Sequence, residues 1–268
     1  MSFELVVIGG GRMGSALVQG LLSAEWCAPD SLAIIEVAVQ QREELLRRFE
    51  GVTVLSTLEL DHVGPETGVV LSVKPDYAEG VARLAAACGV RRILSVVAGL
   101  STSRIEAAFV EPVAVVRSMP NTPVLIRRGV SAIAGGSQVS SADLDWAESI
   151  LSAVGTVVRV AERHIDAVTG LSGSGPAYFY LVVEAMIEAG VHQGLTREVS
   201  RQLVLGTFEG SAALLRESGE SPEELRAQVT SPGGTTAAGL RMLEGRAVRA
   251  AFLEAVASAA ERSRQLGR

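Results

Sequence analysis

Short apolar runs alternate with amphipathic patterns along the chain as far as Val160. Continuous apolar runs of a few residues are typical of strands buried in a parallel sheet, and apolar residues three or four positions apart are typical of helices. The runs predict strands over 5–8, 31–37, 52–55, 67–73, 92–97, 113–117 and 129–134. The helical spacing predicts helices over 13–24, 42–49, 78–87 and 102–109. This alternation favours a doubly wound parallel sheet with right-handed crossovers.

Beyond Val160 the pattern changes, and helical spacing with almost no strand signal occupies the rest of the chain. It predicts helices over 179–189, 197–215, 222–229 and 247–265. We therefore predict an α/β protein with two domains. The first is a Rossmann-like, doubly wound domain over residues 1–162, and the second is an all-α domain over residues 163–268.

Composition and charge argue against several classes of protein. The formal net charge is -6 and only 4% of residues are aromatic, which disfavours a nucleic-acid surface built on positive charge or base stacking. The first residues lack the basic segment of a secretory signal, and the apolar runs are too short to cross a membrane. The two cysteines, Cys27 and Cys88, make no disulfide framework and are interpreted as apolar filling. We expect a cytoplasmic protein without a metal site.

A glycine motif follows the first predicted strand. Gly9, Gly11 and Gly14 have G-x-G-x-x-G spacing at the start of a predicted helix. The first glycine permits a tight turn, the second lets a pyrophosphate approach the backbone, and the third lets the helix pack closely on the strand. The N-terminus of the helix offers free N–H groups and a positive dipole end to phosphates. We predict a dinucleotide site here, and the alternative is a tight turn that binds nothing.

Glu36 closes the second predicted strand, at the distance from the glycines where an acidic residue bonds the ribose 2′-hydroxyl of NAD. A 2′-phosphate needs a cation at this place, and the next residue is Val37. Arg42 is able to reach the same place from the following helix. The hypothesis is that Glu36 with Val37 favours NADH over NADPH.

Lys74, the only lysine of the chain, follows the fourth predicted strand in the segment 72–75, which reads SVKP. Ligands of doubly wound sheets bind at the carboxyl ends of the strands. The segment is interpreted as a wall of a nicotinamide pocket, and the alternative is a solvated lysine beside a turn. Gly99, at the end of the fifth predicted strand, permits a close approach of the backbone to a cofactor.

Two loops in the helical half lack charge and are rich in glycine and hydroxyl residues: 172–178 (SGSGPAY) and 230–240 (TSPGGTTAAGL). Backbone N–H groups and hydroxyls in such loops hold small anions. The second loop is predicted to hold a substrate carboxylate, and the alternative is a helix N-cap made by Thr or Ser with an early Pro. The alternative for the first loop is a glycine-rich helix break where two helices cross closely.

The motifs of this chain resemble those of pyrroline-5-carboxylate reductases in identity and in order. They are GGGRMGSAL, SVKP, VVAG, RSMPNTP, LSGSGPAYFYL and TSPGGTTAAGL, and they extend over nearly the whole chain. The resemblance implies reduction of the C=N bond of 1-pyrroline-5-carboxylate to L-proline, the last step of proline biosynthesis, with NADPH or NADH. It also implies a homodimer whose C-terminal helices interlock, with the helical domain serving dimerisation and substrate binding, and it leaves open further assembly into a decamer.

The resemblance also assigns roles to residues. It matches the family's pyrophosphate loop to Gly9, Gly10, Gly11, Arg12, Met13 and Gly14. It matches the walls on the nicotinamide side to Ser72, Val73, Lys74, Pro75, Ala98 and Gly99, and the segment that reaches the nicotinamide to Met119, Pro120 and Asn121. The loop that takes the substrate carboxylate, supplied by the neighbouring subunit, matches Ser231, Gly234, Thr235 and Thr236. The hydroxyl of Thr236 is implied near the ring nitrogen and is the candidate catalytic group.

This chain departs from the family's pattern at two places. Many members have a Ser-Asn-Arg-like or Asp-Arg-like segment where this chain has Glu36-Val37-Ala38, which puts an NADP preference in doubt. Many have an asparagine after the third strand, where this chain has Ser56 or Thr57. Neither departure touches the chemistry of the reduction.

Three other functions compete with this interpretation. Dehydrogenases of the β-hydroxyacid and phosphogluconate type also join a dinucleotide domain to helices, but they use a lysine in the helical part, and this chain has no lysine after Lys74. A reductase of other cyclic imines would leave the carboxylate loop unused. A non-catalytic dinucleotide sensor, which signals through its helices, has no need of the SPGGTT segment.

Overall fold

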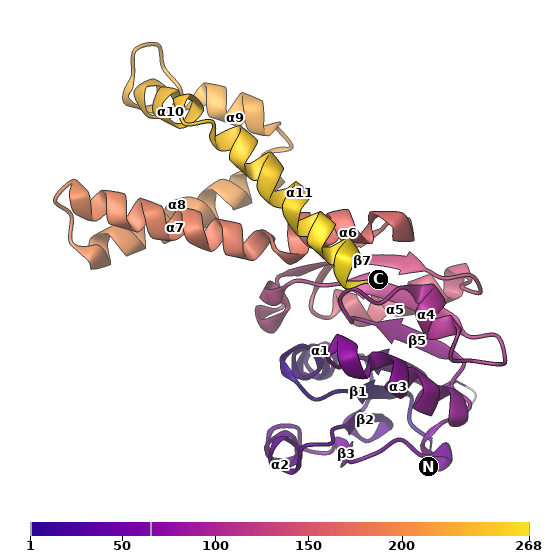
Figure 1. The fold of residues 1–268 in the computed structure, drawn as a ribbon. Coiled ribbons are helices and arrows are strands. Elements are labelled where there is room, and N and C mark those ends of the chain that lie inside the picture. Colours follow the sequence, from indigo (N-terminus) through magenta and orange to yellow (C-terminus); the bar gives the residue numbers. More distant parts are fainter. Residues whose placement is uncertain (1, 65, 268) are drawn as a thin grey trace. The chain divides into compact units, whose positions relative to one another are not determined.

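The structure is a computed structural model that describes residues 2–64 and 66–267. The chain divides into two compact units, and Figure 1 shows its course. The first unit combines Met1–Ser174 with Ala257–Arg268, the end of the last helix, and it contains the sheet. The second unit, Gly175–Val256, is made of helices.

Eight strands of the described residues form one sheet in the order β3-β2-β1-β4-β5-β6-β7-β8. The strand order reverses between β1 and β4, and a ligand crevice is expected outside the carboxyl ends of the strands at such a reversal. The strands are β1 Leu5–Ile8, β2 Leu32–Ile35, β3 Thr53–Leu55, β4 Gly68–Leu71, β5 Arg92–Ser95, β6 Ala114–Met119, β7 Gly129–Gly135 and β8 Gly155–Arg159.

Helices cover both faces of the sheet. One face packs against α1, α2 and α5, and the other packs against α3 and α4. The central strands β1, β2 and β4 consist of continuous runs of apolar residues because both faces of the sheet are buried there. These helices are α1 Arg12–Ser23, α2 Val39–Arg48, α3 Pro75–Ala87, α4 Thr102–Glu106 and α5 Ser141–Ser152, and the short helices η1 Pro29–Ser31 and η2 Leu60–His62 lie between elements.

The predicted fold class is confirmed, and the parallel arrangement holds from β1 to β6. For β7 the parallel prediction is wrong, because β7 pairs antiparallel with β6 and β8 continues parallel to β7. The connection between β6 and β7, 120–128, contains only the short helix η3 (Thr122–Ile126). It is shorter than the dozen or so residues that a parallel crossover requires, so the chain returns antiparallel.

Besides the short helices, three elements lie where the sequence predicts neither a helix nor a strand: β8, α5 and α10 (Thr235–Gly245), which begins within the loop predicted over 230–240. β8 is the last strand of the sheet, and its mixture of half-buried and exposed side chains gives no continuous apolar run. α5 buries Ala147, Ile150 and Leu151 between polar residues, so its apolar stripe is narrow. Ser140 and Asp143 form a capping box at its start, which is the local signal that would have located this helix.

The end of the last helix belongs to the first unit because polar contacts hold it there. Arg117 on β6 is buried and forms ion pairs with Glu162 at 3.4 Å and with Asp166 at 4.0 Å. Ser263 Oγ donates a hydrogen bond to Asp166 Oδ1 at 2.6 Å. Asp166 lies on a short helical stretch composed of η4 Glu162–His164, α6 Ile165–Val168 and the π-helix η5 Thr169–Gly173.

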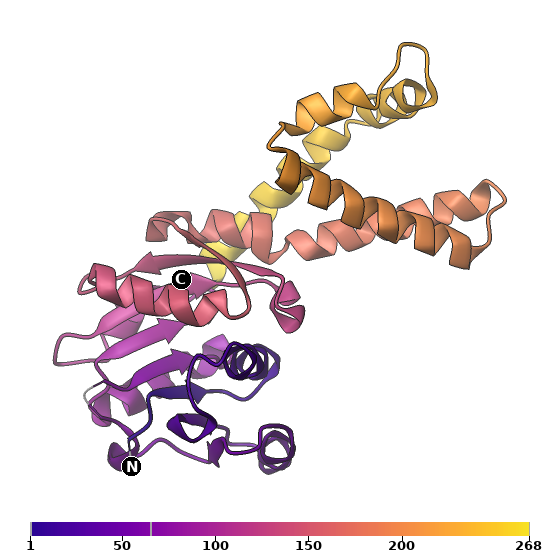
Figure 2. The ribbon, with the colours of Figure 1, turned by 180° about the vertical axis from the view of Figure 1, so that it is seen from behind.

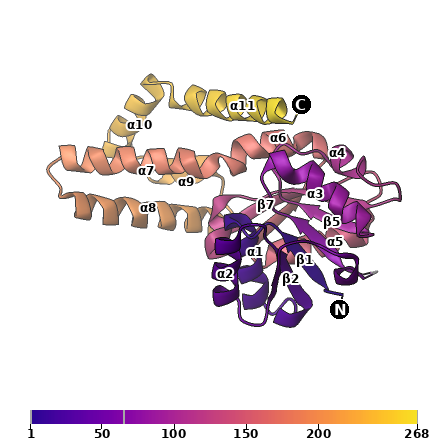
Figure 3. The same cartoon turned by 60° about the horizontal axis from the view of Figure 1, so that its bottom comes forward.

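The second unit is helical, as predicted. α7 and α8 lie side by side (Figures 2 and 3). The rings of Phe179 and Phe208, one on each helix, meet edge to face with centroids 5.9 Å apart. None of the helices in the described part of the chain has the length and apolar character of a membrane span. The helices after the sheet are α7 Gly175–His192, α8 Arg197–Ser218, α9 Pro222–Gln228, α10 Thr235–Gly245 and α11 Val248–Leu266, the last of which continues into the first unit.

Candidate active site

The turn between β1 and α1 has the geometry expected of its glycines. Gly9 has a φ of +105°, a conformation that favours glycine, and a Cβ on Gly14 would overlap the carbonyl oxygen of Gly9. Apart from its two chain neighbours, no described residue has an atom within 4 Å of the place a Cβ would take on Gly11. α1 begins at Arg12, and its N-cap Gly11 supplies no side-chain acceptor. The first N–H groups of α1 are therefore open to an anion.

The carboxylate of Glu36 is held beside this turn by two backbone N–H groups. Gly10 N donates to Oε2 at 3.0 Å, and Ala38 N donates to Oε1 at 2.9 Å. The carbonyl of Gly10 accepts hydrogen bonds from Ser15 Oγ at 2.8 Å and from Gln41 Nε2 at 3.2 Å. Gly10 is thus held through both its N–H group and its carbonyl oxygen. The carboxylate of Glu36 keeps further lone pairs that can accept hydrogen bonds from a ligand at the end of β2.

Arg42 lies against the backbone that follows β2. Its Nη1 donates to the carbonyl oxygens of Glu36 at 2.9 Å and of Val37 at 2.7 Å. Val37 is 81% exposed. The position next to Glu36 therefore offers an apolar surface, and the nearby cation is engaged with backbone carbonyls.

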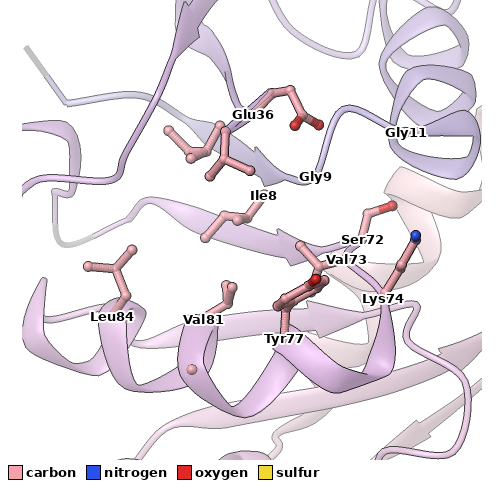
Figure 4. A pocket seen from close by; sticks show the side chains of 13 residues that line it. Ile8, Gly9, Gly11, Glu36, Ser72, Val73, Lys74, Tyr77, Val81 and Leu84 are labelled. Atoms are coloured by element: carbon pink, nitrogen blue, oxygen red, sulfur yellow. The ribbon is translucent and has the colours of Figure 1, made fainter. Parts of the chain in front are cut away.

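A cavity of about 550 Å³ opens beside the glycine turn and the carboxyl ends of β1, β2 and β4. Figure 4 shows Tyr77, Val81 and Leu84 in a row along α3, with Glu36 on the opposite wall. An apolar slot with a few polar groups at its ends is the usual character of a nucleotide site. The lining residues are Ile8, Gly9, Gly11, Ile35, Glu36, Val37, Ser72, Val73, Lys74, Tyr77, Gly80, Val81 and Leu84.

Ser72 carries a buried hydroxyl that points toward the glycine turn. Its Oγ has no hydrogen-bond partner among the described residues, and it lies 3.3 Å from the place a Cβ would take on Gly14. A buried polar atom without a partner costs free energy, so a ligand that supplies a partner is stabilised there. The open helix N-terminus, the uncrowded Gly11 and this hydroxyl together fit the pyrophosphate side of a dinucleotide.

Other predicted cofactor residues take other places. Arg12 lines a neighbouring cavity of about 450 Å³ that shares Gly11 with the first, and Met13 packs against the core. Pro75 is the first residue of α3, directly after Lys74 at its N-cap. Gly99, with a φ of +74°, lines a separate cavity of about 220 Å³, and Ala98 before it is exposed.

Asn121, at the N-cap of η3, directs its amide toward protein groups. Oδ1 accepts a hydrogen bond from Val130 N at 2.9 Å, and Nδ2 donates to the carbonyl oxygen of Ser172 at 3.2 Å. The preceding residues of the same segment are Met119, which ends β6, and Pro120, which is buried.

The hydroxyl-rich loop in the second unit leads directly into α10. The N-cap is Gly234, which has no side chain to cap the helix, while Thr230 Oγ1 donates backward to the Arg226 carbonyl at 2.6 Å. The alternative prediction, in which a Thr or Ser side chain caps this helix, is therefore wrong for α10. The first N–H groups of α10 stay open to an anion, next to the hydroxyls of Thr235 and Thr236.

Comparison with known proteins places the chain in a family. Residues 162–266 match the model described as pyrroline-5-carboxylate reductase dimerisation, and residues 4–99 match the one described as NADP oxidoreductase, coenzyme F420-dependent. The pyrroline-5-carboxylate reductase of Corynebacterium melassecola is 40% identical over 98% of both chains. That of Synechocystis is 39% identical over 100% of both chains. The chain belongs to the pyrroline-5-carboxylate reductase family.

Solved structures of this family have the same fold. The pyrroline-5-carboxylate reductase of Coxiella burnetii superposes with a TM-score of 0.92 at 31% identity, over 99% of both chains. The pyrroline carboxylate reductase of Plasmodium falciparum, solved with NADP bound, superposes with a TM-score of 0.86 at 31% identity, over 99% of this chain and 98% of the other.

In this member of the family, the cavity of about 550 Å³ is also lined by a row of side chains on α3 that was not predicted from the sequence. Tyr77, Val81 and Leu84 have the i, i+4, i+7 spacing of one helix face, and they follow Lys74 at the ligand edge of the sheet. That spacing was the available signal.

The two thiols have the environment of structural cysteines. Burial, with a smaller contribution from the charge of Glu4, raises the pKa of Cys27 to about 11. Burial also raises the pKa of Cys88. Because the thiolate is the reactive form, a raised pKa lowers the reactivity of both side chains at neutral pH.

Proposed function

We infer that this chain reduces 1-pyrroline-5-carboxylate to L-proline, the last step of proline biosynthesis, with a hydride from NADH or NADPH. The observation that carries the inference is the 39–40% identity to pyrroline-5-carboxylate reductases along at least 98% of the chain. The reductase with NADP bound, from Plasmodium falciparum, supports a nicotinamide dinucleotide as the cofactor.

The reduction does not require an acidic or basic side chain to transfer a proton to the substrate. A bound nicotinamide supplies a hydride, which forms the new C–H bond while the C=N electron pair moves onto the already protonated nitrogen. The protein has to orient the reacting atoms at about 3–3.5 Å from one another. The loops 172–178 and 230–240 contain no His, Asp, Glu or Cys, which agrees with catalysis by orientation. Neutral donors in these loops also avoid repelling a cationic imine.

Residues 1–162 are proposed to bind the dinucleotide, and residues 163–268 to provide the dimer contacts and the substrate loop. The pyrophosphate is assigned to the turn Gly9–Gly14 and the start of α1, because the first N–H groups there are uncapped and the space at Gly11 is open. Ser72 and Lys74 are assigned to the neighbouring wall of the cavity, with the 119–121 segment on the nicotinamide side.

The substrate carboxylate is assigned to the N-terminus of α10. The open N–H groups behind Gly234, together with the hydroxyls of Ser231 and Thr235, supply donors without a cation. The Thr236 hydroxyl is placed at the ring nitrogen, so Thr236→Ala is expected to lower kcat.

Glu36 is proposed to select NADH. Its carboxylate, fixed by the N–H groups of Gly10 and Ala38, accepts hydrogen bonds from ribose hydroxyls but repels a 2′-phosphate. Two unit charges about 4 Å apart near a protein surface interact with about 4 kcal/mol, and a tenfold preference needs only about 1.4 kcal/mol. Arg42 is bound to the carbonyls of Glu36 and Val37 through Nη1, so only its remaining N–H groups would be available to a 2′-phosphate.

The active enzyme is proposed to be a cytoplasmic homodimer with interlocked C-terminal helices, which is able to assemble further into a decamer. The matched dimerisation model over residues 162–266 supports the dimer. The two cysteines are both free, as is usual in a reducing compartment.

The test is oxidation of NADH and of NADPH by the purified protein with racemic 1-pyrroline-5-carboxylate, with proline assayed as the product. We expect proline with both cofactors and a kcat/KM at least about tenfold higher for NADH. Glu36→Gln, which removes the charge but keeps the shape, is expected to narrow that ratio. A preference for NADPH in the wild type would disprove the role of Glu36 alone, and no proline with either cofactor would disprove the reductase.

A further inference from the structure

Asn121 is the only asparagine in the chain, and its amide joins two segments that are far apart in sequence. Oδ1 accepts from Val130 N at the start of β7, and Nδ2 donates to the Ser172 carbonyl in η5. The two partners fix the orientation of the amide, because the opposite orientation would set donor against donor and acceptor against acceptor. The two hydrogen bonds occupy the carbonyl oxygen and one hydrogen of the amide nitrogen.

The carbonyl of Ser172 needs a donor from outside its helix. An α-helical carbonyl accepts from the N–H four residues later, and that residue is Pro176, which has no N–H. The backbone just before it follows a π-helical path, with Ser174 N donating to the Thr169 carbonyl at 2.8 Å. π-Helical turns are rare and are frequent at functional sites. The amide of Asn121 supplies the donor that Pro176 cannot.

A second contact holds the same two segments together. The Cε of Met119 lies 2.6 Å from the place a Cβ would take on Gly173, so the methionine side chain at the end of β6 packs directly against the π-helix. The segment 119–121 therefore touches η5 at two points, one apolar and one polar. Its position is set by η5, and η5 leads into α7 at Gly175.

We propose that Asn121 is a positioning residue of the reductase, which fixes the 119–121 segment against the π-helix and binds neither cofactor nor substrate itself. The proposal rests on the proposed function, since it assigns the segment to the nicotinamide side. It replaces the direct cofactor contact that the sequence analysis gives to Asn121. An error of about 1 Å in a positioning segment costs up to about 100-fold in rate, so the effect falls on kcat.

Asn121→Asp tests this with a change of one functional group. The carboxylate keeps the bond from Val130 N, but its second oxygen faces the Ser172 carbonyl, and two acceptors repel. Protonation of that oxygen restores a donor, and the facing carbonyl raises the pKa of the new carboxyl above its ordinary value of about 3.9. The kcat of the variant, divided by that of the wild type at the same pH, is expected to fall about tenfold or more at pH 8 and to recover toward pH 5. The dissociation constant for NADH, from fluorescence titration, is expected to change less than about threefold.

Gln138→Glu is the matched control, because it makes the same amide-to-acid change on an exposed loop of the first unit. The ratio of its kcat to that of the wild type is expected to be the same at pH 8 and at pH 5. If Asn121→Asp fails to fold at pH 8, Asn121→Ser, which cannot span both partners, is expected to lower kcat with little change in NADH affinity.

Three results would overturn the proposal: a wild-type kcat for Asn121→Asp at every pH, a loss that does not recover on acidification, or a large loss of NADH affinity with kcat retained. The wild type is assayed first. Absence of turnover there would be a failure of the proposed function, whereas an unaffected variant of an active enzyme would be a failure of this inference.

Discussion

A single methyl group would have different effects at two glycines of the turn after β1. On Gly14 it overlaps the Gly9 carbonyl oxygen, so α1 has to shift from β1. On Gly11 it meets no described residue within 4 Å apart from the two chain neighbours, but it stands where a phosphate would approach the helix N-terminus. The two positions therefore separate the stability of the turn from its capacity to bind a dinucleotide.

We expect Gly14→Ala to lower the free energy of unfolding by about 1–3 kcal/mol, as overpacking does. We expect Gly11→Ala, at the N-cap of α1, to lower it by no more than about 1 kcal/mol and to weaken NADH binding about tenfold or more. Urea denaturation and fluorescence titration of NADH measure the two quantities. Equal stability of Gly14→Ala and the wild type would contradict the packing argument, and unchanged NADH affinity in Gly11→Ala would contradict the phosphate assignment.

Individual residues differ in how far the sequence alone predicts them. Glu36 was predictable because its place relative to the glycines is set by one strand and one turn, and the carboxylate does lie beside the turn, bound to Gly10 N. The hydrogen-bond partners of Asn121 were not predictable, because strand pairing brings Val130 close to it and the π-helix brings the Ser172 carbonyl close to it. Hydrophobic periodicity carries information on neighbours in a helix or strand but none on such contacts.

At the scale of helices and strands, too, the features set by local sequence were predictable and the features set by distant contacts were not. The strands from β1 to β6 and the long helices other than α5 and α10 follow from local apolar patterns, so their predicted ranges overlap the observed ones. The direction of β7 depends on the length of its connection to β6, and β8 depends on having β7 as a partner at the edge of the sheet. Pro176 lies in α7, just after the π-helix η5, and its missing N–H was visible in the sequence, although the consequence for the Ser172 carbonyl was not.

The N-terminus of α10 offers a prediction that separates stability from substrate binding. Gly234 at the N-cap has a φ of -78°, which any residue adopts, and the nearest atom to an added Cβ is the Ser231 hydroxyl, which is able to rotate away. Gly234→Asp is expected to leave the melting temperature equal or higher, because Asp caps helices well. It is also expected to raise the KM for 1-pyrroline-5-carboxylate about tenfold or more, because a second carboxylate occupies the proposed anion site.

Gly234→Ser separates the charge from the cap. Serine caps the helix without a charge, so its KM is expected to rise less than that of the aspartate variant. Steady-state kinetics with varied substrate, together with NADH titration, check this, and NADH affinity is expected to stay at the wild-type value in both variants. An unchanged KM in Gly234→Asp would place the substrate carboxylate elsewhere.

At the scale of the whole molecule, the second unit exposes more apolar surface than a solitary helical unit should. Phe179 is 55% exposed, Leu203 is 57% exposed and Leu253 is 73% exposed. Large apolar side chains exposed on several helices of one unit are expected at a protein–protein contact. The matched dimerisation model extends over all three residues, so we expect them to be buried between two copies of the chain.

If the interlocked dimer brings the α10 loop of one subunit to the cofactor cavity of the other, two defective subunits should form one working site. A Gly11→Ala subunit has a weakened cofactor turn and an intact loop, and a Gly234→Asp subunit has the reverse. In their heterodimer, one site combines both defects and the other combines both intact parts. Random pairing at equal amounts makes half of the dimers mixed, so about a quarter of the wild-type activity is expected.

The measurement is turnover of co-expressed variants, carrying different tags, at substrate and NADH concentrations where each variant alone is nearly inactive. Two-step affinity purification isolates the mixed dimers, whose activity is then expected to be about half that of the wild type. Mixed dimers no more active than the parent variants would mean that cofactor and substrate loop meet within one chain. In that case the dimer would serve stability alone, and Thr236 would act on the cofactor held by its own subunit.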